Sequence, residues 1–523
     1  MQRSLTIFSV LAIFCIANAQ LFIAVKDNAR IEVHEVQTLP QDYVAYAVYK
    51  NEVNVDGFDK LTVFSNGEYS NEDQMFAYGM LHGYSMHTRI FEYRNNFLAH
   101  TFPNGVSKCI YSYLRQQLVY MRDLSVEGGW YNRQLGMTVA QFDGYVAGYQ
   151  LRHPTGEKYL SQYDLMLVAS EGDMYEVQPH CDEDLPNYTN CDQKCLDYLR
   201  DRSSCTVGMR KIKGDFFAFH NTWSYYASNL RVKVDLTLAL SPVTFKTRYT
   251  SKPGYLFSKD DFYVIESSGL FVTETTNSVL DKSVLKNVSP HTVPTWARVM
   301  MASRMATTAK EWAETFAKHS SGTYASGWIV ADMKLTKQDP LPSESVYLAE
   351  DAPGKVCVGP IADAIVERGN QWSSYNIPFF PECYEYMGYK EFSKTHPDYV
   401  YADAPRRKIA DRELPKINTY DEFRAFSRYN EYKSDPVSGG DPSKSICSRY
   451  DLRDEHAAAF GCLDAKVTSA DDTLNGQADI ICGPTHSTAD LPPFQWSTSA
   501  FKDEVHDGCP DVYDFPWIRI SEE

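Results

Sequence analysis

The stretch 203–223, SSCTVGMRKIKGDFFAFHNTW, decides how the rest of the sequence is interpreted. Residues of β character follow Cys205, a Gly214-Asp215 pair is suited to a tight turn, and an apolar run then ends at His220. Two strands joined by such a turn lie side by side. The sequence therefore predicts a β-hairpin that brings His220 close to Cys205.

A thiol beside an imidazole makes Cys205 a candidate nucleophile, because the thiolate is the attacking form and a neighbouring cation favours it. Most cysteines of a secreted chain are paired in disulfides, however. A His at the end of a strand is usually a hydrogen-bonded structural residue. The spacing alone therefore leaves the catalytic and the structural interpretation open.

The same stretch resembles the signature of the phospholipase B-like family, which belongs to the N-terminal-nucleophile hydrolases. Further family motifs follow in order through the C-terminal two thirds of the chain: YLFSKDDFY (255–263), SGLFVTETT (268–276), SGTY (321–324) with Trp328, SYNIP (374–378), DAPR (403–406), KVTS (466–469) and PPFQWSTS (492–499). Several motifs that occur in the family's order identify the family far more specifically than any single motif does. Most relatives begin with Cys-Ser where this chain has Cys205-Thr206, which leaves the nucleophile unchanged.

The resemblance implies an α+β fold, in the form of a four-layer αββα sandwich with two antiparallel sheets between helical layers. It also implies that the precursor cuts its own chain between Ser204 and Cys205. The domain would then consist of an N-terminal fragment, 20–204, which includes the processing segment, and a C-terminal fragment, 205–523, which begins with the nucleophile. We expect the two fragments to stay associated.

By resemblance, five further side chains line the site: His220, Trp223, Thr276, Asn376 and Arg406. We expect His220 to orient the amine or thiol of the nucleophile, and Asn376 to donate a hydrogen bond to the oxyanion of the substrate. Thr276 would hydrogen-bond the amine or the substrate. Arg406 would hold the polar head of the substrate or set the polarity of the site, and Trp223 would wall the pocket.

Structural alternatives exist for three of these residues. Trp223 is equally well explained as part of the core. Asn376 precedes Ile-Pro and would then only shape a turn. Arg407 directly follows Arg406, so either arginine can be the one that matches the family position.

The chemistry expected of a new N-terminus needs no separate catalytic triad. The thiol of Cys205 would attack the carbonyl of Ser204, and water would open the resulting thioester. The freed α-amine has a reference pKa near 7.7–8.0, which suits a general base for its own thiol. We find no G-x-S-x-G, G-D-S-L or H-E-x-x-H motif and no phosphate loop. We expect neither a cofactor nor a metal site.

Residues 1–19, MQRSLTIFSVLAIFCIANA, have the pattern of a secretory signal peptide. One basic residue precedes an apolar centre, and Ala17-Asn18-Ala19 forms a small-x-small cleavage site. The alternative is an uncleaved membrane anchor, but the apolar centre is short for a bilayer span. We expect no transmembrane anchor and a protein that resides in the secreted or lysosomal lumen.

Charge limits the partners of the chain. It has 51 basic and 68 acidic residues, a formal net charge of -17. Nucleic acid needs clustered Lys and Arg, and so does docking on anionic membranes, so both are disfavoured. A phospholipid or another acyl lipid would have to reach the site through an apolar cleft.

Twelve cysteines are present, and eleven remain once Cys15 leaves with the signal peptide. An odd number in an oxidising lumen indicates one unpaired thiol, which we assign to Cys205. The other ten allow up to five disulfides: Cys109, Cys181, Cys191, Cys195, Cys357, Cys383, Cys447, Cys462, Cys482 and Cys509. Cys191 and Cys195 lack the second ligand pair of a zinc site. Asn187 and Asn287 begin N-glycosylation triplets.

Apolar periodicity predicts the main elements. Alternation from Leu21 to about Tyr49 indicates strands, and further strands are expected near 230–240 and 261–276. Helical spacing runs through 70–93, 295–305 and 308–318. The polar segment 181–204 is expected to form an exposed loop that contains the cut. No linker or repeat divides the chain, so we predict one large domain of layered α+β type.

These observations predict a self-processed acyl hydrolase that releases fatty acids from glycerophospholipids through a Cys acyl-enzyme. Two alternatives stay open. The first is an amidase for N-acyl amides or N-acyl lipids, since other hydrolases of this type cleave amides. The second is a lumenal lipid-binding protein that keeps the fold without turnover.

Overall fold

A computed structural model describes residues 19–28, 30–182, 186, 188–203, 205–212, 214–487 and 490–521. The predicted signal peptide (except its last residue), the glycosylation site Asn187 and the residue before the expected cut, Ser204, lie outside the described residues. The fold is a mixture of large sheets and helices, which confirms the predicted α+β class.

The larger of the two main sheets has eleven strands in the described part of the chain. Neighbouring strands are antiparallel, except for the parallel pair β4 and β8. The strands in spatial order are β14 (Lys355–Pro360), β13 (Val346–Ala352), β12 (Ser326–Asp332), β11 (Leu270–Thr276), β10 (Phe262–Ile265), β9 (Phe245–Ser251), β8 (Val232–Leu238), β4 (Asp59–Ser65), β3 (Ala45–Lys50), β1 (Ala19–Asp27) and β2 (Arg30–Val36). The strands expected in 21–49, 230–240 and 261–276 are all among them.

The smaller sheet contains the predicted hairpin and is antiparallel throughout its described strands. Its order is β15 (Gln371–Ser374), β5 (Thr206–Ile212), β6 (Asp215–Asn221), β17 (Asp464–Ser469), β18 (Asp479–Cys482) and β19 (Ile518–Arg519). A separate pair joins β7 (Trp223–Tyr225) to β16 (Phe460–Cys462).

Alternating side chains on the strands build one core between the two sheets and a second core outside each sheet. On β6, Phe216 and Ala218 enter the core shared with the larger sheet, while Phe217 and Phe219 enter the outer core. On β12, Ile329 lies in the shared core and Trp328 on the opposite side. Because successive side chains of a strand point to opposite faces, each sheet is apolar on both faces. One face packs against the other sheet and the opposite face against helices.

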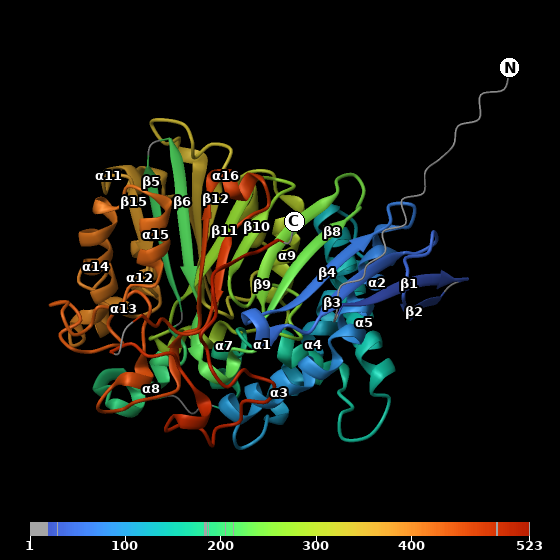
Figure 1. The fold of residues 1–523 in the computed structure, drawn as a ribbon, viewed down its shortest axis with the longest axis horizontal. Helices are drawn as coiled ribbons and strands as arrows, with labels where there is room; N and C mark the ends of the chain where they lie inside the picture. The colour runs from blue at the N-terminus through green and yellow to red at the C-terminus, as the bar shows by residue number, and fades with distance from the viewer. Residues whose placement is uncertain are drawn as a thin grey trace.

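Helices cover the outer faces of the sheets (Figure 1). One outer core contains α14 (Pro405–Glu413) and α15 (Tyr420–Ser427), which pack on the smaller sheet. The other contains the helices against the larger sheet: α2 (Asn71–Ser85), α3 (His87–Thr101), α4 (Lys108–Ser125), α5 (Trp130–Arg152), α6 (Gln162–Ala169), α7 (Met174–Asp182), α9 (Thr295–Met305) and α10 (Ala309–Phe316). The remaining helices are α1 (Val53–Asp56), α8 (Gln193–Arg200), α11 (Ala362–Glu367), α12 (Pro381–Tyr386), α13 (Tyr389–Phe392) and α16 (Ala470–Leu474).

The predicted helices at 295–305 and 308–318 are present as α9 and α10. The helical spacing over 70–93 belongs to two helices, because the backbone leaves the helical conformation at Met86. No helix in the described ranges combines the length and the apolar character needed to cross a membrane.

Helices α2 and α5 touch through their backbones at four glycines. A Cβ added to Gly79 would lie 1.9 Å from the carbonyl oxygen of Gln141, and one added to Gly144 would lie 2.0 Å from that of Phe76. Gly83 and Gly148 meet the partner backbone in the same way, with added Cβ atoms 2.2 and 2.0 Å from carbonyl oxygens. The two Gly-x-x-x-Gly pairs thus set the distance between the helices.

We expect Gly144→Ala to lower the free energy of unfolding by about 2–3 kcal/mol, since the new methyl group would push the two backbones apart. Gly136→Ala is the matched control on the same helix, because its added Cβ would find no atom closer than 3.7 Å. That control should be neutral or stabilising by up to about 1 kcal/mol through helix propensity. Urea unfolding of both variants measures the difference, and equal effects would contradict this account of the helix contact.

His82 on α2 is enclosed near the rings of Tyr78 and Tyr145, and burial lowers its pKa to about 4. An unfolded His titrates near 6.5, so the unfolded chain takes up the proton first and stability is lost as the pH falls from 6.5 towards 4. Between pH 7 and pH 5 this residue should cost about 2 kcal/mol of unfolding free energy. The His82→Leu variant should lose about 2 kcal/mol less unfolding free energy than the unmutated chain between the two pH values, as measured by urea unfolding. An unchanged pH dependence would contradict the assignment.

The structure contains four disulfides among the described residues: Cys109–Cys181, Cys191–Cys195, Cys357–Cys383 and Cys447–Cys462. Disulfides of this kind persist in oxidising compartments. Cys205 is a free thiol, as expected, but the prediction of only one unpaired thiol is wrong. Cys482 and Cys509 are also free; the sulfur of Cys482 contacts Oδ1 of Asn229, and that of Cys509 contacts the carbonyl oxygen of Ala227.

Candidate active site

The hairpin predicted from the sequence places the first two site residues. Strands β5 and β6 pair Val207 with His220, and the turn contains Gly214 with a φ of 79°. Cys205 directly precedes β5, with a φ of 94° and only 1% of its surface exposed. A left-handed backbone is unusual for a residue with a side chain and is often found where function requires it.

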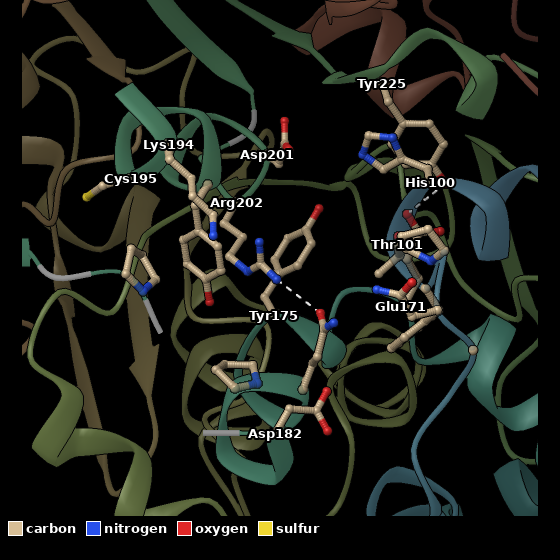
Figure 2. Close-up of a pocket in the computed structure, with 18 of the residues that line it drawn as sticks. His100, Thr101, Glu171, Tyr175, Asp182, Lys194, Cys195, Asp201, Arg202 and Tyr225 are labelled. Atoms are coloured by element: carbon tan, nitrogen blue, oxygen red, sulfur yellow. Dashed lines mark hydrogen bonds between the residues drawn. The ribbon is translucent and has the colours of Figure 1, made fainter. Parts of the chain in front are cut away.

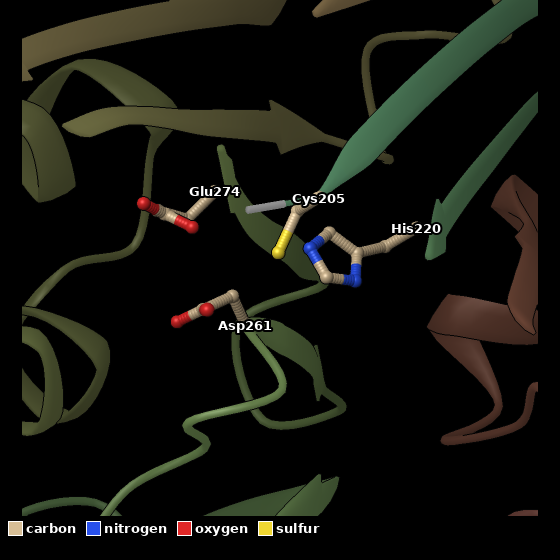
Figure 3. A group of neighbouring side chains, drawn as sticks. All are labelled: Cys205, His220, Asp261 and Glu274. Carbon is tan, nitrogen blue, oxygen red and sulfur yellow. The ribbon is translucent and has the colours of Figure 1, made fainter. Parts of the chain in front are cut away.

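Two carboxylates from the larger sheet join the thiol and the imidazole (Figure 3). The ladder of β10 and β11 ends with the pair Phe262 and Thr273, and Asp261 and Glu274 are the residues that directly adjoin this pair. One sulfur, nitrogen or carboxylate oxygen from each residue lies within 4.8 Å of those of the others. We call this buried group the four-donor cluster: Cys205, His220, Asp261 and Glu274.

The electrostatics keep the thiol and the imidazole neutral in the uncut chain. Burial raises the pKa of Cys205 well above its ordinary value, the charges of Glu274 and Asp261 act in the same direction, and Lys259 opposes them. Burial also lowers the pKa of His220 well below its ordinary value, and Lys466 adds to this shift. The imidazole is therefore no cation that could stabilise the thiolate, contrary to the simple expectation from the sequence.

Burial also disfavours the charged form of the two carboxyl groups. Burial raises the pKa of Glu274 well above its ordinary value, and the neighbouring charge of Asp261 adds to the effect. Asp261 is also raised by burial, with Lys259 acting against the shift. Tyr324 links these groups, because its hydroxyl donates to Asp261 (2.6 Å) and accepts from Nζ of Lys259 (2.9 Å).

Arg406 holds the backbone at the nucleophile. Its Nη1 donates to the carbonyl oxygen of Cys205 (2.6 Å) and to Oγ1 of Thr206 (3.0 Å). Its Nη2 donates to the carbonyl oxygen of Tyr375 (2.8 Å) and to Oδ1 of Asn376 (2.7 Å). Burial lowers the pKa of this guanidinium to about 10, which still leaves it charged at neutral pH.

Trp223 and Asn376 contact Arg406 directly, and Thr276 is connected to it through Asn376. The guanidinium lies 4.3 Å from the ring centre of Trp223, a cation–π contact. Nδ2 of Asn376 donates to the carbonyl oxygen of Thr276, the last residue of β11, at 2.6 Å. Arg407 points elsewhere and pairs with Asp411 on its own helix. The structure thus brings together all six residues, and of the two adjacent arginines it is Arg406 that contacts them.

Backbone strain is concentrated here. Among the described residues other than glycine, eight have a positive φ, and four of these are Cys205, Asp261, Tyr324 and Asn376. Such conformations cost of order 1–3 kcal/mol each and persist where the surroundings impose them. Their concentration around one thiol makes this place the candidate functional site.

The segment before the nucleophile covers it and is more ordered than the sequence indicated. The expectation of an exposed loop over 181–204 is wrong for 193–200, which form α8, because Cys195 and Leu199 are buried against Tyr375 and Ile377. Amphipathic spacing of those two residues stabilises the helix. Oγ of Ser203 is hydrogen-bonded to Oγ of Ser278 at 2.7 Å.

Cavities lie on both sides of α8. One, of about 240 Å³, is lined by Trp223, Asn376 and Arg406 together with α8 residues such as Leu196 and Arg200. The other, of about 520 Å³, is lined by Glu171, Tyr175 and Tyr225 and by Lys194 of α8 (Figure 2). Displacement of α8 would therefore widen the cavity beside Trp223, Asn376 and Arg406.

Sequence reasoning missed four residues around Cys205 and His220: Lys259, Asp261, Glu274 and Tyr324. All four lie within motifs that carry the family resemblance, YLFSKDDFY, SGLFVTETT and SGTY. Glu274 is two residues before Thr276, and strand alternation puts both on one face. The position of Glu274 near the site could therefore have been predicted from the sequence. The other three depend on contacts between distant segments.

Comparison with known proteins identifies the family of the chain. The family model described as Phospholipase B matches residues 45–520. The chain belongs to the phospholipase B family. Phospholipase B-like 1 of Homo sapiens is 32% identical to it, over 91% of this chain and 87% of the relative.

Two further phospholipase B-like relatives are similar over comparable lengths. Phospholipase B-like protein G of Dictyostelium discoideum is 31% identical, over 92% of this chain and 86% of its own. Phospholipase B-like 1 of Rattus norvegicus is 30% identical, over 95% and 90%. The resemblance seen in the sequence motifs of this phospholipase B family member therefore extends over most of the chain.

Proposed function

We propose that this protein is a self-processing acyl hydrolase of the N-terminal-nucleophile type, which releases fatty acids from glycerophospholipids in the secreted or lysosomal lumen. One arrangement carries this proposal. A buried free thiol directly precedes β5 in a left-handed backbone conformation, and Arg406 holds its carbonyl oxygen. The family name supports a lipid substrate, and helices outside two packed sheets are compatible with the four-layer αββα sandwich of that class.

Self-cleavage begins at the bond between Ser204 and Cys205. The thiol loses its proton and attacks the Ser204 carbonyl, the peptide nitrogen leaves as the α-amine of Cys205, and a thioester forms. Water then opens the thioester to give the Ser204 carboxylate and the free thiol. The products are the fragments 20–204 and 205–523, which stay associated because β4 of the first pairs with β8 of the second.

The mature site works with the new α-amine as the base. The amine takes the proton of the Cys205 thiol, which suits a site where burial and Lys466 keep His220 from becoming a cation. The thiolate attacks the ester carbonyl, Asn376 donates to the oxyanion, and the alcohol leaves with the proton from the amine. Water completes the cycle by hydrolysing the acyl-enzyme.

His220 and Thr276 position the amine and thiol, and Trp223 walls the cavity that the polar head of the lipid enters beside Arg406. This cavity is narrowed by α8 in the uncut chain. Cleavage before Cys205 frees the chain end that follows α8, so that the segment can move and admit an acyl chain.

A second candidate is an amidase that acts on N-acyl amides or N-acyl lipids. The self-cleavage step itself breaks an amide, so the same thiol would be competent against amide substrates. A third is a lipid-binding protein without turnover. The processed protein should be incubated in parallel with phosphatidylcholine and an N-acylethanolamine, and the released fatty acid quantified by mass spectrometry.

We expect fatty acid from phosphatidylcholine in amounts that scale with enzyme and time. Release from the N-acylethanolamine alone would replace the ester hydrolase with the amidase. Tight binding of either lipid without any acid released would establish the silent lipid-binding protein and contradict the proposed activity.

A further inference from the structure

The four-donor cluster has the composition of a transition-metal site. It offers a thiol, an imidazole and two carboxylates from four different segments, all of them buried. Sulfur, nitrogen and oxygen donors of these types are the ligands that Zn²⁺ takes in proteins, in tetrahedral sets of four. The donor atoms already lie within 4.8 Å of one another. Figure 3 shows the four side chains around this point.

The polar atoms of the cluster are poorly satisfied within the protein. Neither carboxylate oxygen of Glu274, neither ring nitrogen of His220 and not Oδ1 of Asp261 makes a hydrogen bond of normal geometry with a described residue. The Glu274 carboxyl group interacts with Asp261 and Thr276, and the imidazole interacts with the backbone of Glu274. Buried polar atoms are nearly always fully hydrogen-bonded, so this converging set keeps capacity to bind a ligand. Its chemistry is that of a cation, because two of the three groups are carboxylates.

The charge balance of the cluster favours a cation. Asp261 and Glu274 lie close together just beyond the last pair of the β10–β11 ladder, where two like charges would repel each other. Lys259 faces them and compensates one negative charge. With a thiolate added, three negative charges exceed the two positive charges of Lys259 and Arg406 beside them, so the cluster favours a cation.

We propose that the four-donor cluster binds one Zn²⁺ ion through the sulfur of Cys205, a ring nitrogen of His220 and one oxygen from each carboxylate. Zinc bond lengths place tetrahedral donors roughly 3.3–3.7 Å apart, so the side chains need to close in by about 1 Å. Binding releases to the buffer the proton of the thiol and any proton that the two carboxyl groups hold. All four ligands lie in 205–523, so the site survives cleavage of the chain.

Zinc in this position is an inhibitor rather than a cofactor of the reaction. It engages the sulfur that would attack the Ser204 carbonyl or the lipid ester. We therefore expect zinc to arrest self-cleavage and fatty-acid release, and a chelator to restore both. This consequence rests on the proposed function, whereas the metal site does not.

The test uses the full chain, freed of metal, and measures binding of Zn²⁺ by competition with a chromophoric chelator. We expect one Zn²⁺ per chain with a dissociation constant at or below about 1 µM. Co²⁺ in place of zinc should give a thiolate-to-cobalt charge-transfer band in the near ultraviolet. That band reports sulfur ligation in the unmutated protein, so it does not depend on how any variant folds.

Glu274→Gln should weaken zinc binding by about 100-fold, and Cys205→Ala should also remove the cobalt band. Cys482→Ser is the matched control, since Cys482 is a second buried free thiol outside the cluster, and it should bind zinc as the unmutated chain does. Absence of the cobalt band, a dissociation constant above about 100 µM, or binding unchanged in Glu274→Gln would overturn the site. A chain that shows the band and binds zinc but neither cuts itself nor releases fatty acid after chelation would retain the site and disprove the proposed function.

Discussion

Cys205→Ala is expected to leave the chain in one piece and to abolish fatty-acid release. The substitution removes the sulfur that attacks both the Ser204 carbonyl and the substrate, so both activities end together. Loss of a nucleophile that also creates its own base should lower turnover by at least about 10⁵-fold. Gel electrophoresis of the purified protein and a fatty-acid assay with phosphatidylcholine measure the two effects.

Cys482→Ser is again the control, because Cys482 is a buried free thiol whose nearest polar partner is Asn229, away from the cluster. It should be cut and active like the unmutated chain. A Cys205→Ala protein that is cut normally would show that an external protease does the work. Retained fatty-acid release in that variant would remove Cys205 from the reaction altogether.

Arg406→Met is expected to lower turnover by about 100- to 1000-fold, with the loss mainly in kcat and little change in KM. The guanidinium makes four hydrogen bonds, among them those to the carbonyl of Cys205 and the amide oxygen of Asn376. Without them the nucleophile and the proposed oxyanion donor lose their fixed positions. Steady-state kinetics of processed protein provide the measurement.

Arg407→Met is the matched control, since Arg407 is its neighbour on α14 and pairs with Asp411 instead. Its turnover should stay within about threefold of the unmutated enzyme, because a partly exposed ion pair contributes little. Equal losses in the two variants would indicate a general effect on α14. Full activity of Arg406→Met would exclude the positioning role.

Local chemistry made the hairpin predictable. The Gly214-Asp215 turn and the apolar run before His220 determined which strands pair, and the structure confirms that His220 lies beside the start of β5. Strand alternation likewise accounts for Phe216 and Phe217 entering different cores. The α+β class followed from the mixture of strand and helix periodicities.

What the sequence alone could not give depends on contacts between distant segments. Asp261 meets Glu274 only because β10 and β11 pair in one particular register. The choice between Arg406 and Arg407 required the direction of α14 relative to β5 and Asn376. The free state of Cys482 and Cys509 depends on where each sulfur lies in the fold, which the even count of candidate partners did not reveal.

The N-terminal sequence and intact mass of the larger chain, taken from purified active protein, test the central claim most directly. The account predicts a chain that begins with Cys205 and continues to the C-terminus, together with an N-terminal fragment that ends at or before Ser204. Active protein that is uncut, or whose larger chain retains residues ahead of Cys205, would contradict it, because the amine proposed as the base would then be tied up in a peptide bond.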